Sequence, residues 1–161
     1  MIKVLFVCLG NICRSPTAHG VLERKLAMAG LADLVEVDSA GTAAWHIGKQ
    51  PDLRSQQAAR KRDYDLSHFR ARQAVAEDFL EFDYVLAMDD ENLAGLESIC
   101  PINAPTKPEL FLQTYSTQGL SQVPDPYYGD GDGFERVLDM VEDACDQLVQ
   151  NIRLKLKLKL K

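Results

Sequence analysis

Short apolar runs rich in β-branched residues alternate with amphipathic stripes along this chain. Residues 2–7 have the composition of a buried strand, residues 35–37 and 83–88 are predicted as the second and third strands, and a short strand can form near residues 107–110. Apolar residues recur at helical spacing between these runs, and the clearest stripe, over residues 134–148, predicts a long final helix. Strands that alternate with helices favour a single-domain doubly wound α/β fold, with a four-stranded parallel sheet and helices on both faces.

Length and composition agree with one globular domain. The chain has 161 residues, 46% of them hydrophobic and 26% charged, which excludes a disordered chain, a coiled coil and a collagen-like repeat. The apolar run at residues 4–9 is too short for a spanning helix or a signal peptide, so we expect no stable membrane insertion and a cytoplasmic protein.

Charge divides the chain into an acidic body and a basic end. Residues 153–161 contain five cations and no acid, while residues 1–150 contain 13 cations and 24 acids and carry a net charge of −11. An acidic body argues against a nucleic-acid partner. The end alternates Lys and Leu with period 2, which does not continue the helical stripe. We therefore expect a domain over residues 1–152 and a tail that is solvated, or that contacts anionic lipid or another acidic molecule weakly.

The four cysteines do not indicate a disulfide scaffold or a zinc site, because they are few and lack the spacing of metal ligands. Cys100 and Cys145 lie in apolar segments and are predicted to be small buried hydrophobes. We expect no metal and no cofactor.

Candidate chemistry begins after the first predicted strand. Cys8, Arg14 and Ser15 have the pattern Cys, five residues, Arg, Ser, between a buried strand and a helix start. A loop there can direct backbone N–H groups at a tetrahedral anion, helped by the helix dipole. Its anion-binding residues would be Leu9, Gly10, Asn11, Ile12, Cys13, Arg14 and Ser15. The bare spacing also fits a structural turn around a buried cysteine.

Each of these three side chains has a role that suits phosphate chemistry. A thiolate at Cys8 would be the nucleophile, stabilised by backbone amides and by the Arg14 cation. The planar fork of Arg14 can bind two phosphate oxygens at once. The Ser15 hydroxyl can donate to the sulfur and help it leave.

Five segments, residues 4–16, 38–42, 70–73, 87–89 and 125–128, resemble the low-molecular-weight protein tyrosine phosphatases. They occur in the family's order and spacing over nearly the whole chain, and only the Lys/Leu tail falls outside. The resemblance implies a metal-independent phosphatase that hydrolyses phosphotyrosine and small aryl phosphates through a cysteinyl-phosphate intermediate. A tyrosine-phosphorylated protein would be its substrate, a tyrosine kinase among the candidates, and the enzyme a monomer or weak dimer.

The resemblance also implies roles for residues outside the first loop. The general acid and base would be Asp125, in an Asp-Pro turn. Trp45, Tyr127 and Tyr128 would form the walls of a cleft that fits an aryl group. Asp89 is either a helix cap or a residue that orients the site.

Asn11, Ser39 and His68 would support the loop through hydrogen bonds, whereas His19 and His46 are left as surface or structural residues. We also hypothesise that Cys13 forms a reversible disulfide with Cys8 that protects the nucleophile from irreversible oxidation.

Three other functions compete with this one. Arsenate reduction needs a closely spaced resolving pair, but Cys100 and Cys145 are 45 residues apart. The protein-arginine phosphatases, a branch of the same family, have a similar loop with Thr where this chain has Ile12. Their acid loop lacks the paired tyrosines. A phosphopeptide-binding module would keep Arg14 but could lose Cys8 or Asp125. Nucleotide-binding glycine motifs and an EF-hand ligand order are absent from the sequence.

Overall fold

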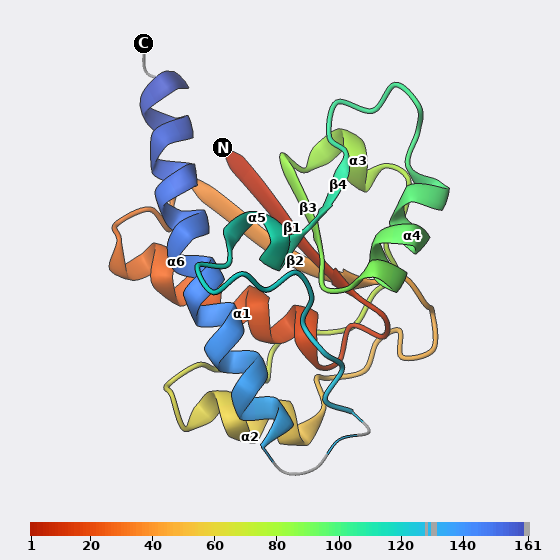
Figure 1. Cartoon of the computed structure of the whole chain (residues 1–161), viewed down its shortest axis with the longest axis vertical. Helices are drawn as coiled ribbons and strands as arrows, with labels where there is room; N and C mark the ends of the chain where they lie inside the picture. The colour runs from red at the N-terminus through yellow and green to blue at the C-terminus, as the bar shows by residue number, and fades with distance from the viewer. Residues whose placement is uncertain (128, 130–131, 160–161) are drawn as a thin grey trace.

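The computed structural model describes residues 1–127, 129 and 132–159. The elements in chain order are β1 (Ile2–Cys8), α1 (Arg14–Met28), β2 (Val35–Gly41), α2 (Leu53–Arg60), α3 (Asp78–Glu81), β3 (Tyr84–Ala87), α4 (Asp90–Ile99), β4 (Pro108–Leu110), α5 (Phe111–Tyr115) and α6 (Gly133–Lys159) (Figure 1).

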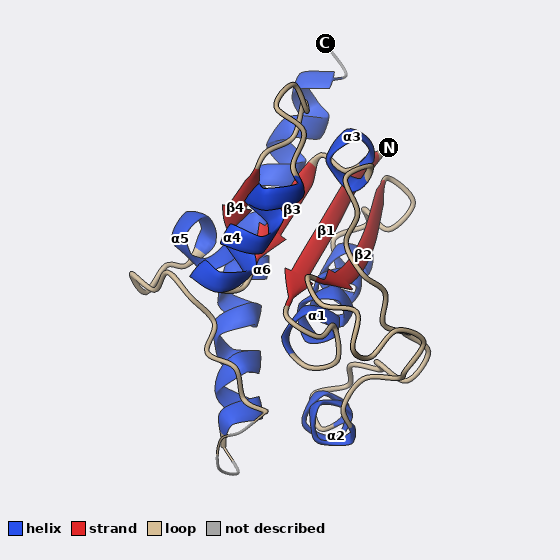
Figure 2. Cartoon of the chain, turned by 90° about the vertical axis from the view of Figure 1, so that its right-hand side faces the viewer, coloured by secondary structure: helices blue, strands red, loops and turns tan. Residues whose placement is uncertain are grey.

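The four strands form one parallel sheet in the order β2-β1-β3-β4. The chain leaves β1 for β2 on one side and then crosses back to β3 on the other, so β1 ends at the point where the strand order reverses. Ligands of doubly wound sheets bind at this position, beyond the carboxyl ends of the strands. Figure 2 shows the loop after β1 at that edge of the sheet.

Alternate residues of β1 serve two separate cores. Ile2, Val4 and Phe6 belong to a core that α1, α5 and α6 cover, and Leu5 and Val7 belong to a core on the other face. The second core includes residues of α3 and α4. Because both faces of the sheet are buried, β1 is a continuous apolar run, which is typical of central parallel strands.

Helices therefore cover both faces of the parallel sheet, as the alternating pattern predicted (Figure 2). Two short helices, α3 and α5, were not predicted, because four or five residues are too few to show a helical period. Strand β2 is longer than expected: it continues to Gly41, and all seven of its residues pair with β1.

The last helix corrects one prediction from the sequence. Residues 153–159 are helical and continue α6, so the change of period at this point does not end the helix. Leu156 packs against the core and the Lys155 ammonium lies 4.4 Å from the centroid of the Tyr84 ring. That the catalytic unit ends at residue 152 stays a prediction.

Two further features bear on the sequence analysis. Cys145 is fully buried, but Cys100 is only half-buried at the end of α4, so the prediction of a buried Cys100 is wrong. It lies at a helix end, where its sulfur is 3.6 Å from the Pro101 carbonyl oxygen. Within the described ranges, no helix is both long and apolar enough to cross a bilayer.

Candidate active site

A cavity of about 250 Å³ opens at the carboxyl end of β1. It brings together residues from three separate parts of the chain: the stretch from the end of β1 to the start of α1, the loop after β2, and the segment that precedes α6. Its lining consists of Cys8, Leu9, Gly10, Ile12, Cys13, Arg14, Trp45, His46, Asp125 and Tyr127. Residues 8–15, here called the phosphate loop, form its floor, and residues 124–127, the acid loop, form part of its rim.

Buried hydrogen bonds hold the phosphate loop in shape. The Asn11 side-chain amide donates to Ser15 Oγ at 2.7 Å, and Ser15 Oγ lies 3.0 Å from Cys8 Sγ. The side-chain oxygen of Asn11, Oδ1, accepts from the Arg72 backbone N–H at 3.0 Å, which ties the loop to a segment 61 residues away. Cys8, Asn11 and Ser15 are all buried. Ser15 can therefore donate its proton to a thiolate at Cys8 while Asn11 fixes its orientation.

Backbone geometry explains two residues of this region. Asn11 has φ of 58°, in the left-handed region that asparagine tolerates better than most residues. Gly41, at the end of β2, lies against the phosphate loop. A Cβ atom there would come within 2.7 Å of the Leu9 carbonyl oxygen and 3.1 Å of the Asn11 nitrogen. The loop can approach β2 this closely only because residue 41 has no side chain.

The start of α1 provides the electrostatic conditions for an anion. The N-cap residue is Cys13, and it makes no side-chain hydrogen bond to the first turn of the helix. The first backbone N–H groups of a helix lack partners within the helix and carry a partial positive charge. Since Cys13 and Arg14 both line the cavity, these groups lie where a phosphate could accept from them.

Arg14 is a buried cation held by acidic partners. Its side chain is only 2% exposed, and its guanidinium donates to the Asp89 carboxylate at 2.6 Å and to the Val123 carbonyl oxygen at 3.0 Å. Burial by itself would lower the pKa of Arg14, but Cys8, Asp89 and Asp125 outweigh it and raise that pKa above its ordinary value. The side chain is therefore a permanent positive charge with a fixed direction.

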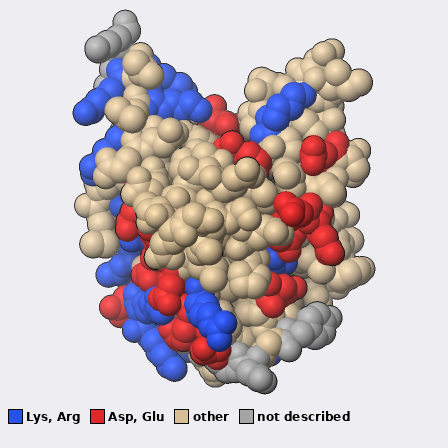
Figure 3. All heavy atoms as spheres, in the orientation of Figure 1, with Lys and Arg blue, Asp and Glu red and all other residues tan. Residues whose placement is uncertain are grey.

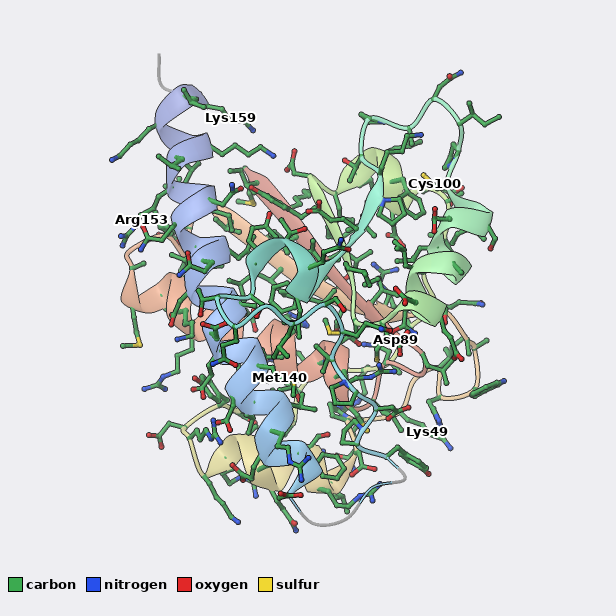
Figure 4. All side chains as sticks on the ribbon, in the orientation of Figure 1. Lys49, Asp89, Cys100, Met140, Arg153 and Lys159 are labelled. Carbon is green, nitrogen blue, oxygen red and sulfur yellow. The ribbon has the colours of Figure 1, made fainter. Side chains whose placement is uncertain are left out.

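Asp89 has both of the roles considered from the sequence. Its side chain caps α4 by accepting from the Asn92 backbone N–H at 2.8 Å, and the same carboxylate holds Arg14. Figure 4 shows Asp89 at the end of β3, next to the start of α4.

Asp125 faces Arg14 from the acid loop. One of its carboxylate oxygens lies 3.7 Å from the Arg14 guanidinium, and the other accepts from the Tyr127 backbone N–H at 3.0 Å. With 34% of its side chain exposed, Asp125 is reached by solvent, in contrast to Arg14. A carboxyl group in this place can exchange protons both with water and with a group bound in the cavity.

Arg54, on α2, holds the acid loop from outside the cavity. Its guanidinium donates to the Tyr127 carbonyl oxygen at 3.2 Å and to the Asp52 carboxylate at 2.9 and 3.0 Å. The guanidinium carbon lies 5.1 Å from the centroid of the Tyr127 ring and 4.9 Å from that of Phe134. These contacts join α2, the acid loop and the start of α6.

The predicted aromatic walls have different positions. Trp45 lines the cavity and is 69% exposed, and Tyr127 also lines it with 37% of its surface exposed. Tyr128, also predicted as a wall, lies outside the described residues. His46 lines the cavity as well, against Gly10, although the sequence analysis left it as a surface or structural residue.

Ser39 has a different histidine beside it from the one that was predicted to support the loop. His19 is buried, and its Nδ1 lies 3.1 Å from Ser39 Oγ. Burial and the nearby His68 lower the pKa of His19 to about 3, so it is neutral at physiological pH. His68 is exposed, and its ring tilts against Phe69. Its predicted hydrogen bond to the loop is not among the contacts of the described residues, and a supporting role for His68 stays a prediction.

Arg54, Gly41 and Arg72 were not assigned functions from the sequence. Each acts on the loops through a contact with a residue far away in the chain. Gly41 and Arg72 lie within segments that carried the family resemblance, which was the one signal that could have indicated them.

Comparisons with known proteins agree with this geometry. A sequence model described as "Low molecular weight phosphotyrosine protein phosphatase" matches residues 3–158. The Schizosaccharomyces pombe protein of that name is 45% identical over 94% of this chain and 97% of its own. A crystal structure of a protein tyrosine phosphatase from Entamoeba histolytica, with Hepes in its active site, is 39% identical. It superposes with a TM-score of 0.91 over 96% of this chain and 99% of its own.

A Drosophila arginine phosphatase also has this fold, with a TM-score of 0.86 and 33% identity over 94% of this chain and 98% of its own. The family model covers nearly the whole chain. The sheet has a doubly wound strand order, and the cavity lies at the end of β1. Sequence and structure therefore agree on the family. This chain belongs to the low molecular weight phosphotyrosine protein phosphatase family, which is a family of hydrolases.

Proposed function

We propose that this protein is a tyrosine phosphatase in which Cys8 is the nucleophile, Arg14 binds the phosphoryl group and Asp125 is the general acid and base. The convergence of these three side chains on one cavity, beside an uncapped helix start, carries the proposal. Two other cavities, one between α1 and α6 and one between α2 and the start of α6, have no cysteine in their lining.

The first half-reaction transfers the phosphoryl group to sulfur. The Cys8 thiolate attacks phosphorus as the bond to the phenolic oxygen breaks, and Asp125 gives its proton to that oxygen so that neutral tyrosine leaves. Arg14 and the first N–H groups of α1 hold the non-bridging oxygens in the transition state. Cys8 then carries a phosphoryl group, and Asp125 is a carboxylate.

The second half-reaction restores the enzyme. The Asp125 carboxylate takes a proton from water, whose oxygen attacks phosphorus, and the bond from phosphorus to Cys8 breaks. Ser15 donates to the departing thiolate, from which its hydroxyl oxygen lies 3.0 Å. Inorganic phosphate leaves, and Asp125 is protonated again for the next turnover.

Selectivity for aryl phosphates follows from the depth of the cavity. Cys8 is buried at the floor, while Trp45 and Tyr127 stand at the rim. A phosphotyrosine can place its ring between these walls while its phosphate reaches Cys8, whereas the stem of phosphoserine is shorter. Asn11 would support the loop through its hydrogen bond to Ser15, with Ser39 and His68 as further supporting residues.

Cys13 is the proposed redox partner of Cys8. Peroxide would oxidise the Cys8 thiolate to a sulfenic acid, releasing water, and the Cys13 sulfur would displace a second water to form the disulfide. Both cysteines line the cavity and are free. Burial and the nearby Asp52 raise the pKa of Cys13 to about 12, so we expect slow disulfide formation. A Cys13→Ser variant that recovers fully with dithiothreitol after peroxide treatment would contradict this role.

We also propose a cellular compartment, an oligomeric state and a class of substrate for the enzyme. The four free cysteines support a reducing compartment, which we take to be the cytoplasm. The protein would act there as a monomer or weak dimer on tyrosine-phosphorylated proteins, including a tyrosine kinase. Sedimentation velocity would measure the oligomeric state, and a Cys8→Ser trap would identify bound phosphoproteins.

Hydrolysis of p-nitrophenyl phosphate in the presence of EDTA and dithiothreitol tests the proposed chemistry. We expect turnover by the wild type, none by Cys8→Ser, and a rate about 100-fold or more lower for Asp125→Asn. Phosphotyrosine, phosphoserine and phosphoarginine peptides then test the substrate class. Faster turnover of phosphoarginine than of phosphotyrosine would overturn the substrate assignment and leave the catalytic roles intact.

A further inference from the structure

The end of α6 differs in charge from the rest of that helix. The first part carries acids, which are largely paired: Arg62 contacts Glu135, Asp139 and Glu142, and Lys25 contacts Asp146. Beyond residue 152 the helix has cations and no acid. Arg153, Lys157 and Lys159 make no ion pair with any described residue, and all three are exposed.

Because this end of α6 is helical, its alternating leucines lie on two different faces of the helix. Leu156 turns inward and packs on the core. Leu154 and Leu158 lie one turn apart on one face, and their exposed fractions are 60% and 72%. Lysines and an arginine flank these two leucines on both sides of the same face. An apolar strip bordered by cations is the pattern of a helix that lies on a membrane surface.

The position of this end leaves the catalytic cavity free. The strands run away from the end where the C-terminus lies, and the cavity is at their carboxyl ends (Figure 2). In Figure 4, Arg153 and Lys159 lie on the protruding part of α6, and Asp89, which contacts Arg14, lies well away from them. Lys and Arg side chains gather over the same end of α6 in Figure 3.

We propose that the basic tip of α6, residues 153–159, docks this protein on anionic lipid surfaces with its active site directed away from the bilayer. The cations would meet lipid headgroups while Leu154 and Leu158 enter the interface. A bilayer fits better than a protein partner, because two leucines on one turn bury far less area than a specific protein interface needs. The acidic body would keep the orientation, since its charges are repelled by the same surface.

Binding of the intact protein to sedimenting vesicles tests this proposal. We expect binding to phosphatidylcholine vesicles that contain phosphatidylserine, little binding to phosphatidylcholine alone, and a decrease as salt screens the charges. Lys157→Gln/Lys159→Gln should weaken binding about 10- to 30-fold. Arg60→Gln/Lys61→Gln, which removes two exposed cations from α2 and the residue after it, is the matched control and should bind as the wild type does.

A second pair of variants tests the leucines. Leu154→Gln/Leu158→Gln should weaken binding about tenfold even at low salt, whereas Leu80→Gln/Ile102→Gln, which changes two exposed apolar residues elsewhere, should not. All four variants should keep wild-type turnover of p-nitrophenyl phosphate.

Four outcomes would overturn the proposal. The first is equal binding to neutral and anionic vesicles, and the second is an equal loss in a control variant. The third is self-association without vesicles that the tip variants abolish, because the tip would then contact a second copy of the chain. A tip variant that loses turnover together with vesicle binding would also overturn it, since the tip would then belong to the catalytic unit.

Discussion

The phosphate loop and the acid loop supply opposite halves of one reaction, and they are built differently. Cys8, Asn11 and Ser15 are buried and bonded to one another, and the neighbouring backbone of β2 and the Arg72 segment holds the phosphate loop in place. The acid loop lies at the surface and depends on Arg54 and on its own turn. A transition state needs fixed charges, whereas a proton donor must also reach water, so the two loops need different degrees of burial.

The largest effect should come from the fixed cation of the phosphate loop. Arg14→Lys keeps the charge but loses the fork that holds Asp89 and Val123 while it faces the phosphoryl group. We expect kcat for p-nitrophenyl phosphate to fall about 1,000-fold. Arg54→Lys, the same change beside the acid loop, should cost less than about tenfold. An equal fall in kcat for Arg14→Lys and Arg54→Lys would contradict the different roles of the two loops.

Glycine replacement compares the packing of the two loops directly. Gly41→Ala forces a Cβ atom to within 2.7 Å of the Leu9 carbonyl oxygen and should displace the phosphate loop. We expect kcat to fall about 100-fold and the free energy of unfolding to fall by about 1–3 kcal/mol. The control is Gly129→Ala beside the acid loop, where the nearest atom would be 3.7 Å away. Steady-state kinetics and thermal melts of both variants measure kcat and stability. A larger effect of Gly129→Ala than of Gly41→Ala would contradict the tighter packing of the phosphate loop.

The tether of the acid loop should affect proton donation selectively. Arg54→Ala removes the hydrogen bond to the Tyr127 carbonyl oxygen and the contact with its ring, so Asp125 should be held less well. Leaving groups that need protonation should react about tenfold more slowly, and acidic ones should react nearly as in the wild type. Rates for a series of aryl phosphates provide the test. In an Asp125→Asn background, Arg54→Ala should have little further effect, because no proton donor remains to be positioned.

Stability below neutral pH should report the burial of His19 beside Ser39. The pKa of His19 falls to about 3 in the folded protein from an ordinary value of 6.5, with burial as its main cause. Between these values the unfolded chain binds the proton and the folded chain does not. The free energy of unfolding should therefore decrease as pH falls through this window, by up to about 1.4 kcal/mol per unit from this residue. Urea denaturation at several pH values should show a smaller slope for His19→Gln, and an unchanged slope would contradict the assignment.

Local patterns in the sequence were sufficient for the sheet, the helices that span several turns and the phosphate loop. Strand β1 and the stripe of α6 are long enough to show their period, and Cys8, Arg14 and Ser15 are neighbours along one loop. Asp125 was indicated by an Asp-Pro turn together with the family resemblance. Helices α3 and α5 were missed, since fewer than two turns show no period, and the end of α6 was misjudged from its change of period.

Contacts between distant segments could not be obtained in this way. Asn11 binds a residue 61 positions away, Arg54 holds a carbonyl group 73 positions away, and His19 lies within hydrogen-bond distance of Ser39, 20 positions away. Sequence alone determined which residues could supply a nucleophile, a cation and an acid, because those properties belong to the side chains. Only the tertiary structure decided which groups hold them, because burial, distance and direction depend on how the chain returns to the end of β1.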